Sequence, residues 1–203
     1  MEKFRSLESL IGAKPIDVLS EILYLNQNIE QVNFWHYTYV PLKFDEAGKN
    51  DYWLNRDAIL KGGKIDEIIS SLSETEQLAL GSQVILNNGE HGHIPQMDFN
   101  LSKNPENTLK IKERLKYMKS SGGWILETGS SYHFWGNKVL SNTEWIDFMG
   151  RCLLTSIVHT RQDIEQVADT RFIGHALRRG CTTLRLTTRS DKTFVPSVVD
   201  YVE

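Results

Sequence analysis

The chain has 203 residues, of which 40% are hydrophobic and 24% are charged, and its formal net charge is −3. These proportions are typical of a soluble globular protein, and the length favours one domain over residues 1–203. The negative net charge argues against tight, non-specific binding of duplex nucleic acid. No apolar run approaches the roughly 18 residues of a membrane span, and the N-terminal segment contains acids and is unlike a signal peptide. We therefore expect a cytoplasmic protein with no membrane partner.

The N-terminal region, residues 1–79, is predicted to contain helices and one long strand. Leucine and isoleucine recur at helical spacing near its start, where Pro15 is expected to divide the helix into two. A stretch dense in aromatic and β-branched residues then predicts the strand. In chain order we expect a helix over 6–30, a strand over 32–44, a loop over 45–51, a strand or short helix over 52–63 and a polar-faced helix over 64–78.

The following region, residues 80–199, is predicted to be the core of the fold. One helix begins at Pro105 and has Leu109, Leu115 and Met118 along its apolar side. We expect strands over 82–88 and 94–100 around a loop at 88–93, a helix over 105–120, strands over 123–129 and 131–137, a helix over 141–159, a mostly helical or irregular segment over 161–177, and strands over 181–189 and 193–199. This order predicts an α+β fold with helices packed on one mixed or antiparallel sheet.

Ser131 and His133 lie two residues apart in the predicted strand SYHFWG. Because alternate side chains leave the same side of a strand, both should lie on one face. A hydroxyl and an imidazole on one face can donate two hydrogen bonds to a phosphate. The alternative is that His133 is a core histidine with its own hydrogen-bond partner.

Asp98 lies near the end of the strand predicted over 94–100, and Asn100 follows two residues later on the same side. A carboxylate beside an amide oxygen can hold a hard cation such as Mg²⁺ or Mn²⁺. The alternative is an aspartate that caps the loop before Pro105.

Residues 151–192 contain eight lysine and arginine residues against four acids. A local basic site in a mildly acidic protein suits a nucleotide or a short strand better than long DNA. Asp169 and Arg171 lie at the start of the basic part, and Arg185 is expected to point away from the face of its leucine neighbours, where it can present a two-pronged donor to phosphate. Alternatively, a solvated face or structural ion pairs account for Arg178, Arg179 and Arg185.

His91 and His93 follow Glu90 in a glycine-rich segment. Two imidazoles and a carboxylate resemble a zinc or iron site, whereas a hydrogen-bonded loop is the simpler interpretation. Elsewhere, Cys152 and Cys181 are too few for a zinc ribbon or a disulfide framework, and we expect both to be small buried side chains.

The order of these motifs resembles that of the archaeo-eukaryotic primase, or primase-polymerase, superfamily. That family has an acidic motif on a strand, a Ser-x-His motif on a later strand and a third acid near a basic strand. Asp98 in MDFN, the pair in SYH, and Asp169 followed by Arg171 and the strand around Arg185 are similar to these motifs in the same order. The resemblance covers roughly residues 80–199 and implies an RRM-like core.

The resemblance also implies a function, metal-dependent nucleotidyl transfer from a nucleoside triphosphate, with nucleic acid as a possible further partner. It implies that Asp98 and Asp169 hold Mg²⁺ or Mn²⁺ and act in catalysis with His133. Phosphate or template contacts would come from Ser131, Arg171, Arg178 and Arg185. The family's first motif usually supplies two acids spaced two apart, whereas position 100 is asparagine here.

Three hypotheses follow. The first is a primase-polymerase-like nucleotidyltransferase. The second keeps the fold and nucleotide or nucleic-acid binding but drops catalysis, because Asn100 replaces a carboxylate. The third is a metal-dependent phosphohydrolase that uses His91, His93 and Asp98.

Overall fold

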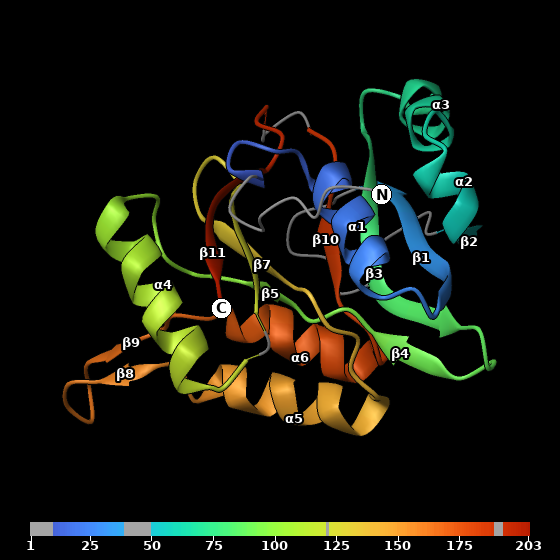
Figure 1. Ribbon diagram of the computed structural model, residues 1–203. Helices are drawn as coiled ribbons and strands as arrows, with labels where there is room; N and C mark the ends of the chain where they lie inside the picture. The colour runs from blue at the N-terminus through green and yellow to red at the C-terminus, as the bar shows by residue number, and fades with distance from the viewer. Residues whose placement is uncertain (1–9, 39–49, 121, 189–192) are drawn as a thin grey trace.

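The computed structural model describes residues 10–38, 50–120, 122–188 and 193–203. Within these residues the strands form two main antiparallel sheets and a small two-stranded ribbon, with helices around them (Figure 1). The predicted α+β class is therefore confirmed, but the expectation of one sheet is wrong. Among the described helices, none is both long enough and apolar enough to cross a membrane.

The five-stranded sheet has the order β10–β3–β1–β2, and β4 pairs with β3 as well. Its long middle strand β3 pairs with β1 along one edge and with β10 and β4 along the other. The predicted N-terminal region thus shares a sheet with the predicted core. The strands are β1 (Ile29–Thr38), β2 (Asn50–Asn55), β3 (Glu76–Leu86), β4 (His91–His93) and β10 (Thr183–Arg185).

The four-stranded sheet has the order β11–β6–β7–β5. The chain enters it from β4 across Ile94 and Pro95, so β5 connects the two sheets. The hairpin of β6 and β7 turns at Gly129, whose positive φ of 95° explains the glycine there. The strands are β5 (Gln96–Asp98), β6 (Gly123–Glu127), β7 (Tyr132–Gly136) and β11 (Ser197–Val202), and the ribbon is β8 (Ile157–Val158) with β9 (Ile164–Glu165).

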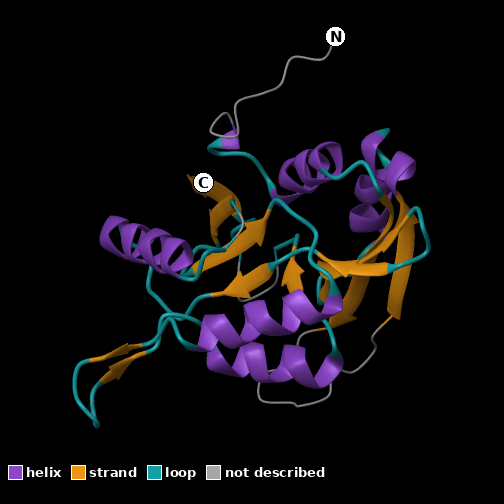
Figure 2. Cartoon of the chain, turned by 60° about the horizontal axis from the view of Figure 1, so that its bottom comes forward, coloured by secondary structure: helices purple, strands orange, loops and turns teal. Residues whose placement is uncertain are grey.

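The helices pack in two groups. Helix α1 buries Val18, Leu19, Ile22 and Leu23 in a core shared by both sheets. On the other side of the four-stranded sheet, α5 and α6 lie side by side under the strands and α4 covers the outer edge (Figure 2). The helices are α1 (Pro15–Leu25), α2 (Arg56–Leu60), α3 (Lys64–Ser71), α4 (Pro105–Tyr117), α5 (Asn142–Leu153) and α6 (Thr170–Arg179).

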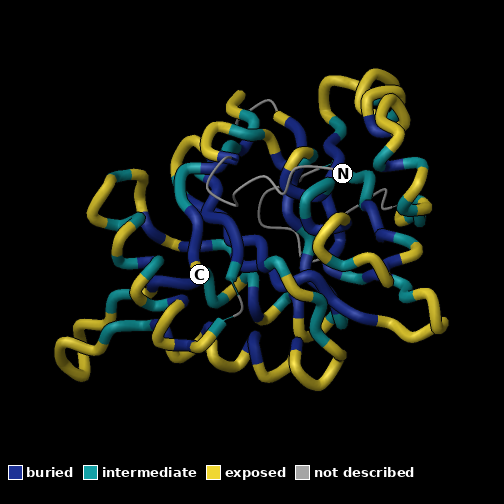
Figure 3. Tube along the Cα trace, in the orientation of Figure 1, coloured by how far each residue is buried: buried dark blue, intermediate teal, exposed yellow. Residues whose placement is uncertain are grey.

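Strand β7 lies between two hydrophobic cores, one on the α1 side of the four-stranded sheet and one on the α5 side. Its side chains point alternately into one core and the other. Phe134 is fully buried against Met97, Ile125 and the α5 side chains, whereas Trp135 belongs to the core on the α1 side. His133 therefore leaves the sheet on the α1 side, away from α5 and α6. The buried trace runs along the strands, and the outer turns of the helices are exposed (Figure 3).

Two predicted helices are confirmed from their first residues, although the helix expected over 141–159 ends at Leu153. Helix α4 begins at Pro105, where Asn104 caps it by accepting from the Asn107 N–H at 2.7 Å. Helix α5 begins after Ser141, which forms a capping box with Glu144. Leu109, however, is 59% exposed, and Ile111 takes its place in the core.

Other predictions are wrong in extent or type. The helix expected over 6–30 is α1 alone among the described residues, and Pro15 begins it instead of dividing it. The helix expected over 64–78 ends at Ser71, and the last residues of that range belong to β3, which starts at Glu76. The expected loop at 88–93 includes β4. Parts of the expected strand over 32–44 and loop over 45–51, residues 39–49, lie outside the described residues.

Candidate functional site

His133, Asp98 and Asp169 form a row of backbone neighbours at the β5 edge of the four-stranded sheet. Asp98 of β5 is the register partner of His133 of β7. On the other side of β5, Phe99 bridges Ala168, and the Asp169 N–H donates to the Asp98 carbonyl at 2.9 Å. Directly opposed residues of antiparallel strands project to the same face. The backbone therefore sets Asp98 beside His133 on one strand and beside Asp169 on the other, while the Asp169 carboxylate bonds to the first turn of α6.

His133 and Asp98 form the closest pair in this row. His133 Nε2 lies 3.7 Å from Asp98 Oδ1, and the two side chains are 7% and 33% exposed. The nearly buried imidazole therefore faces this carboxylate directly across the two paired strands. The half-buried carboxylate keeps one edge open to solvent, as a ligand for a cation requires.

Asp169 has a second role, because it caps helix α6. Its Oδ1 accepts from the main-chain N–H groups of Arg171 at 2.8 Å and Phe172 at 3.1 Å. Capping satisfies donors that the first turn of a helix leaves unpaired. The same carboxylate thus fixes the start of α6 next to Asp98.

Ser131 lies just before β7 and not within it. Its hydroxyl donates to the main-chain carbonyl of Phe99, the residue after Asp98. The Ser131 carbonyl in turn accepts from the Thr128 N–H at 2.8 Å. Ser131 thus ties the β6–β7 turn to the end of β5, and this contact does not support a hydroxyl aimed at a phosphate.

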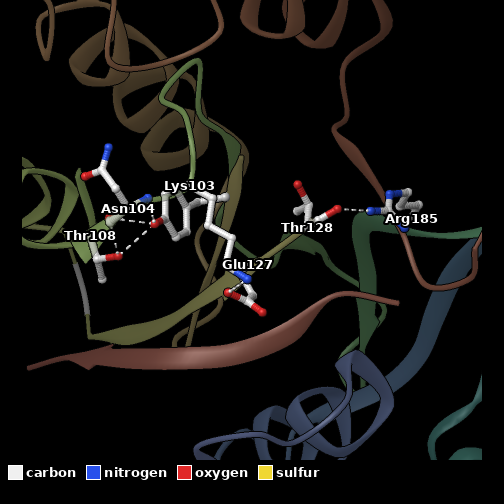
Figure 4. A network of polar contacts seen from close by, with 7 residues as sticks. Lys103, Asn104, Thr108, Glu127, Thr128 and Arg185 are labelled. Atoms are coloured by element: carbon white, nitrogen blue, oxygen red, sulfur yellow. Dashed lines mark hydrogen bonds and ion pairs between the residues drawn. The ribbon is translucent and has the colours of Figure 1, made fainter. Parts of the chain in front are cut away.

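The arginines predicted to bind phosphate occupy different surroundings. Arg171 and Arg178 are exposed on α6, the helix that begins at Asp169. Arg185 is only 6% exposed, and its guanidinium donates to main-chain carbonyls, including that of Thr128 (Figure 4). Arg171 and Arg178 thus lie on a helix that packs on the face of the sheet opposite to His133, whereas Arg185 is used inside the protein.

The carboxylates of Asp98 and Asp169 are the candidate metal ligands. In the part of the chain that the structure describes, no group of three or more His, Cys, Asp and Glu residues could hold a metal ion. The Asn100 N–H donates to the Val167 carbonyl at 2.9 Å, and this exposed residue brings no third carboxylate. Two carboxylates suit Mg²⁺, which proteins often bind through one or two carboxylates and substrate phosphates.

His93 is a structural residue of the five-stranded sheet. It is 3% exposed, its ring stacks on Trp145 at 4.6 Å between centroids, and its Nδ1 lies 3.1 Å from Ser82 Oγ. Burial lowers the pKa of His93 to about 4, so the imidazole is neutral near neutral pH. His91 is exposed on the same strand. None of these contacts favours the phosphohydrolase hypothesis.

Acidification is expected to destabilise the fold through His93. In the unfolded chain its pKa returns to about 6.5, so the unfolded state binds the proton first as the pH falls toward about 4. The free energy of unfolding should decrease over this range by the order of 2 kcal/mol from this residue. Urea titrations of the wild type and His93→Gln at both ends of the range measure the effect. Equal losses in the two proteins would contradict it.

The pairing of the segment before α6 with the end of β5 was not predicted from the sequence. Residues 167–169 pair with the end of β5 through one bridge, and this pairing brings Asp169 to Asp98. Asp169 followed by Thr170 at the start of an amphipathic stretch is a usual helix start, and this was the available signal. The contact of Arg185 with Thr128 could not be predicted from the sequence, because it uses the main-chain carbonyl, which every residue has.

A protein-family model described as archaeo-eukaryotic primase 1D-like (AEP-like) matches residues 60–196. Because the match covers more than half of the 203 residues, the chain belongs to this family. The resemblance inferred from the motif order is thereby confirmed, and the matched region begins earlier than residue 80, so it includes α3. Comparisons with curated proteins and with solved structures give no match.

Proposed function

We propose that the protein binds a nucleoside triphosphate over the row of His133, Asp98 and Asp169 and transfers the nucleotidyl group in a metal-dependent reaction. The observation that carries the proposal is the register that sets these three residues side by side. A buried histidine beside one carboxylate, with a second acid next along the backbone row, suits phosphate chemistry in a primase-like family better than general stability.

Each residue of the row has a proposed role. The His133 imidazole, held beside Asp98, donates a hydrogen bond to the phosphates of the nucleotide. The carboxylates of Asp98 and Asp169 hold Mg²⁺ or Mn²⁺. When bound, such an ion neutralises charge on the transferring phosphate. Arg171 and Arg178, exposed on α6, contact phosphate or a nucleic-acid template.

A second function, nucleotide or nucleic-acid binding without catalysis, is favoured by one observation. Asn100 stands where a second acid of the first motif is usual, and no described residue group supplies three metal ligands. With fewer carboxylates, the hold on two dications weakens. Stabilisation of the fold by nucleotide, without any metal-dependent product, would identify this function.

Nucleotide binding is tested by thermal unfolding of the wild type and His133→Ala with nucleoside triphosphate and Mg²⁺. Saturation at about 100 times Kd should stabilise the wild type by about 2.7 kcal/mol. His133→Ala should lose about half of this, since a tenfold weaker affinity corresponds to about 1.4 kcal/mol. The matched control is His159→Ala, because His159 is an exposed histidine whose side chain lies 3.8 Å from Glu165. Equal stabilisation of all three proteins would refute the proposed site.

A further inference from the structure

The turn between β6 and β7, residues 128–131, immediately precedes the strand that carries His133. Because the turn leads directly into β7, its attachment to neighbouring elements bears on the position of His133. On the α4 side, the Lys103 ammonium pairs with Glu127 at 2.7 Å and the Lys103 N–H donates to the Ser130 carbonyl at 3.1 Å. Figure 4 shows this pair on one side of the hairpin and Arg185 on the other.

Tyr132 strengthens the attachment to α4. Its hydroxyl accepts from the Asn104 N–H at 2.9 Å, donates to the Asn104 carbonyl at 2.8 Å and contacts Thr108 Oγ1 at 3.0 Å. Because Tyr132 and His133 are neighbours, they leave opposite faces of β7. One residue thus fixes the strand to α4 while the next one faces the candidate site.

Arg185 holds the turn from the five-stranded sheet. Its Nη2 donates to the Thr128 carbonyl at 2.6 Å, and its Nη1 donates to the carbonyls of Thr187 at 3.0 Å and Phe194 at 2.7 Å. The guanidinium therefore joins its own strand end, the segment before β11 and the β6–β7 turn. Hydrogen bonds from a charged donor are stronger than neutral ones, and a planar fork can serve several acceptors at fixed angles.

We infer that Arg185 is a positioning residue, which locks the β6–β7 turn to the five-stranded sheet and so sets His133 opposite Asp98. This differs from the phosphate contact that the sequence suggests for Arg185, since three of its donor contacts are with main-chain carbonyls. The inference rests on the proposed function only in that His133 matters for nucleotide binding. The attachment of the turn itself can be measured without nucleotide.

Lysine at position 185 is the discriminating substitution. Arg185→Lys keeps the charge but lacks the planar fork, so it cannot reproduce all three contacts. The Thr128 residue is 3% exposed, and a carbonyl left unpaired there is costly. A residue that merely supplied charge to a phosphate would tolerate lysine far better.

The experiment follows the His133 imidazole by NMR in nucleotide-free protein, together with the melting temperature and the nucleotide Kd. For Arg185→Lys we expect a shifted His133 signal, a melting temperature lower by about 5 °C or more, and a Kd weaker by roughly tenfold. The matched control is Arg151→Lys, because Arg151 also donates to a main-chain carbonyl, that of Met118 at 2.9 Å, which lies at the end of α4 and not in the turn. The control should leave the His133 signal unchanged.

The outcomes separate the possible roles. An unchanged His133 signal and melting temperature with a weaker Kd would make Arg185 a phosphate ligand and overturn the inference. A lower melting temperature with an unchanged His133 signal would make its role one of stability alone, which also overturns it. If the wild type binds no nucleotide, the proposed function fails, while the signal and melting temperature of Arg185→Lys still decide the inference.

Discussion

Asp98→Asn is expected to lower metal-dependent nucleotide incorporation by roughly 100-fold or more, which corresponds to about 3 kcal/mol of transition-state stabilisation. The substitution keeps the size of the side chain and removes its charge. The Asp98 backbone pairs with both β7 and Asp169 through main-chain groups, so the fold should be retained. A radiolabelled or fluorescent incorporation assay with Mg²⁺ or Mn²⁺ measures the loss.

The matched control for this substitution is Asp163→Asn. Asp163 is an exposed aspartate in the turn of the β8–β9 ribbon, which extends away from the rest of the molecule (Figure 1). The Asp163→Asn variant should retain full incorporation activity. Equal activity of Asp98→Asn and the wild type would remove Asp98 from the site. Absence of product with all three proteins, combined with nucleotide-induced stabilisation, would favour binding without catalysis.

Phe134→Ala is expected to destabilise the fold by about 3–5 kcal/mol. Phe134 is 0% exposed between Met97 and Ile125 in register, and its ring lies 6.4 Å from that of Phe148. Truncation removes buried apolar surface and leaves a cavity that the neighbouring strands cannot close. Urea or guanidinium titration gives the free energy of unfolding.

Leu109→Ala is the control for this loss, since Leu109 is 59% exposed on α4. The Leu109→Ala substitution should change the free energy of unfolding by no more than about 0.5 kcal/mol. A loss below about 1 kcal/mol for Phe134→Ala would contradict the packing of β7 against α5. Together with His133→Ala, the substitution tests the alternation of β7, because one residue should affect stability and its neighbour nucleotide binding.

Local features of the sequence could be predicted well. The capped start of α5 at Ser141, the proline start of α4 and the glycine turn of the β6–β7 hairpin each depend on a few consecutive residues. The length of β3 could not be predicted, because its first half follows a helical pattern directly. Strand β4 was equally hidden, since its three residues gain strand geometry only by pairing with β3.

The candidate site depends on contacts between distant residues. Asp98 and His133 were expected on strands, but their direct pairing and the bridge of Phe99 to Ala168 arise from the order of strands in the sheet. The burial of Arg185 depends on carbonyls of Thr128 and Phe194, which no side-chain pattern indicates. The residues of the row could therefore be named from the sequence. The main-chain acceptors of Arg185 could not, and the phosphate contact was expected in their place.

The most direct test of the proposed site is a crystal structure of the protein with a nucleoside triphosphate and Mn²⁺. We expect a phosphate oxygen within hydrogen-bonding distance of His133 Nε2, and an anomalous Mn²⁺ peak on the Asp98 carboxylate next to Asp169. A well-ordered triphosphate bound elsewhere, with no contact to His133 and no Mn²⁺ at Asp98, would contradict the proposal.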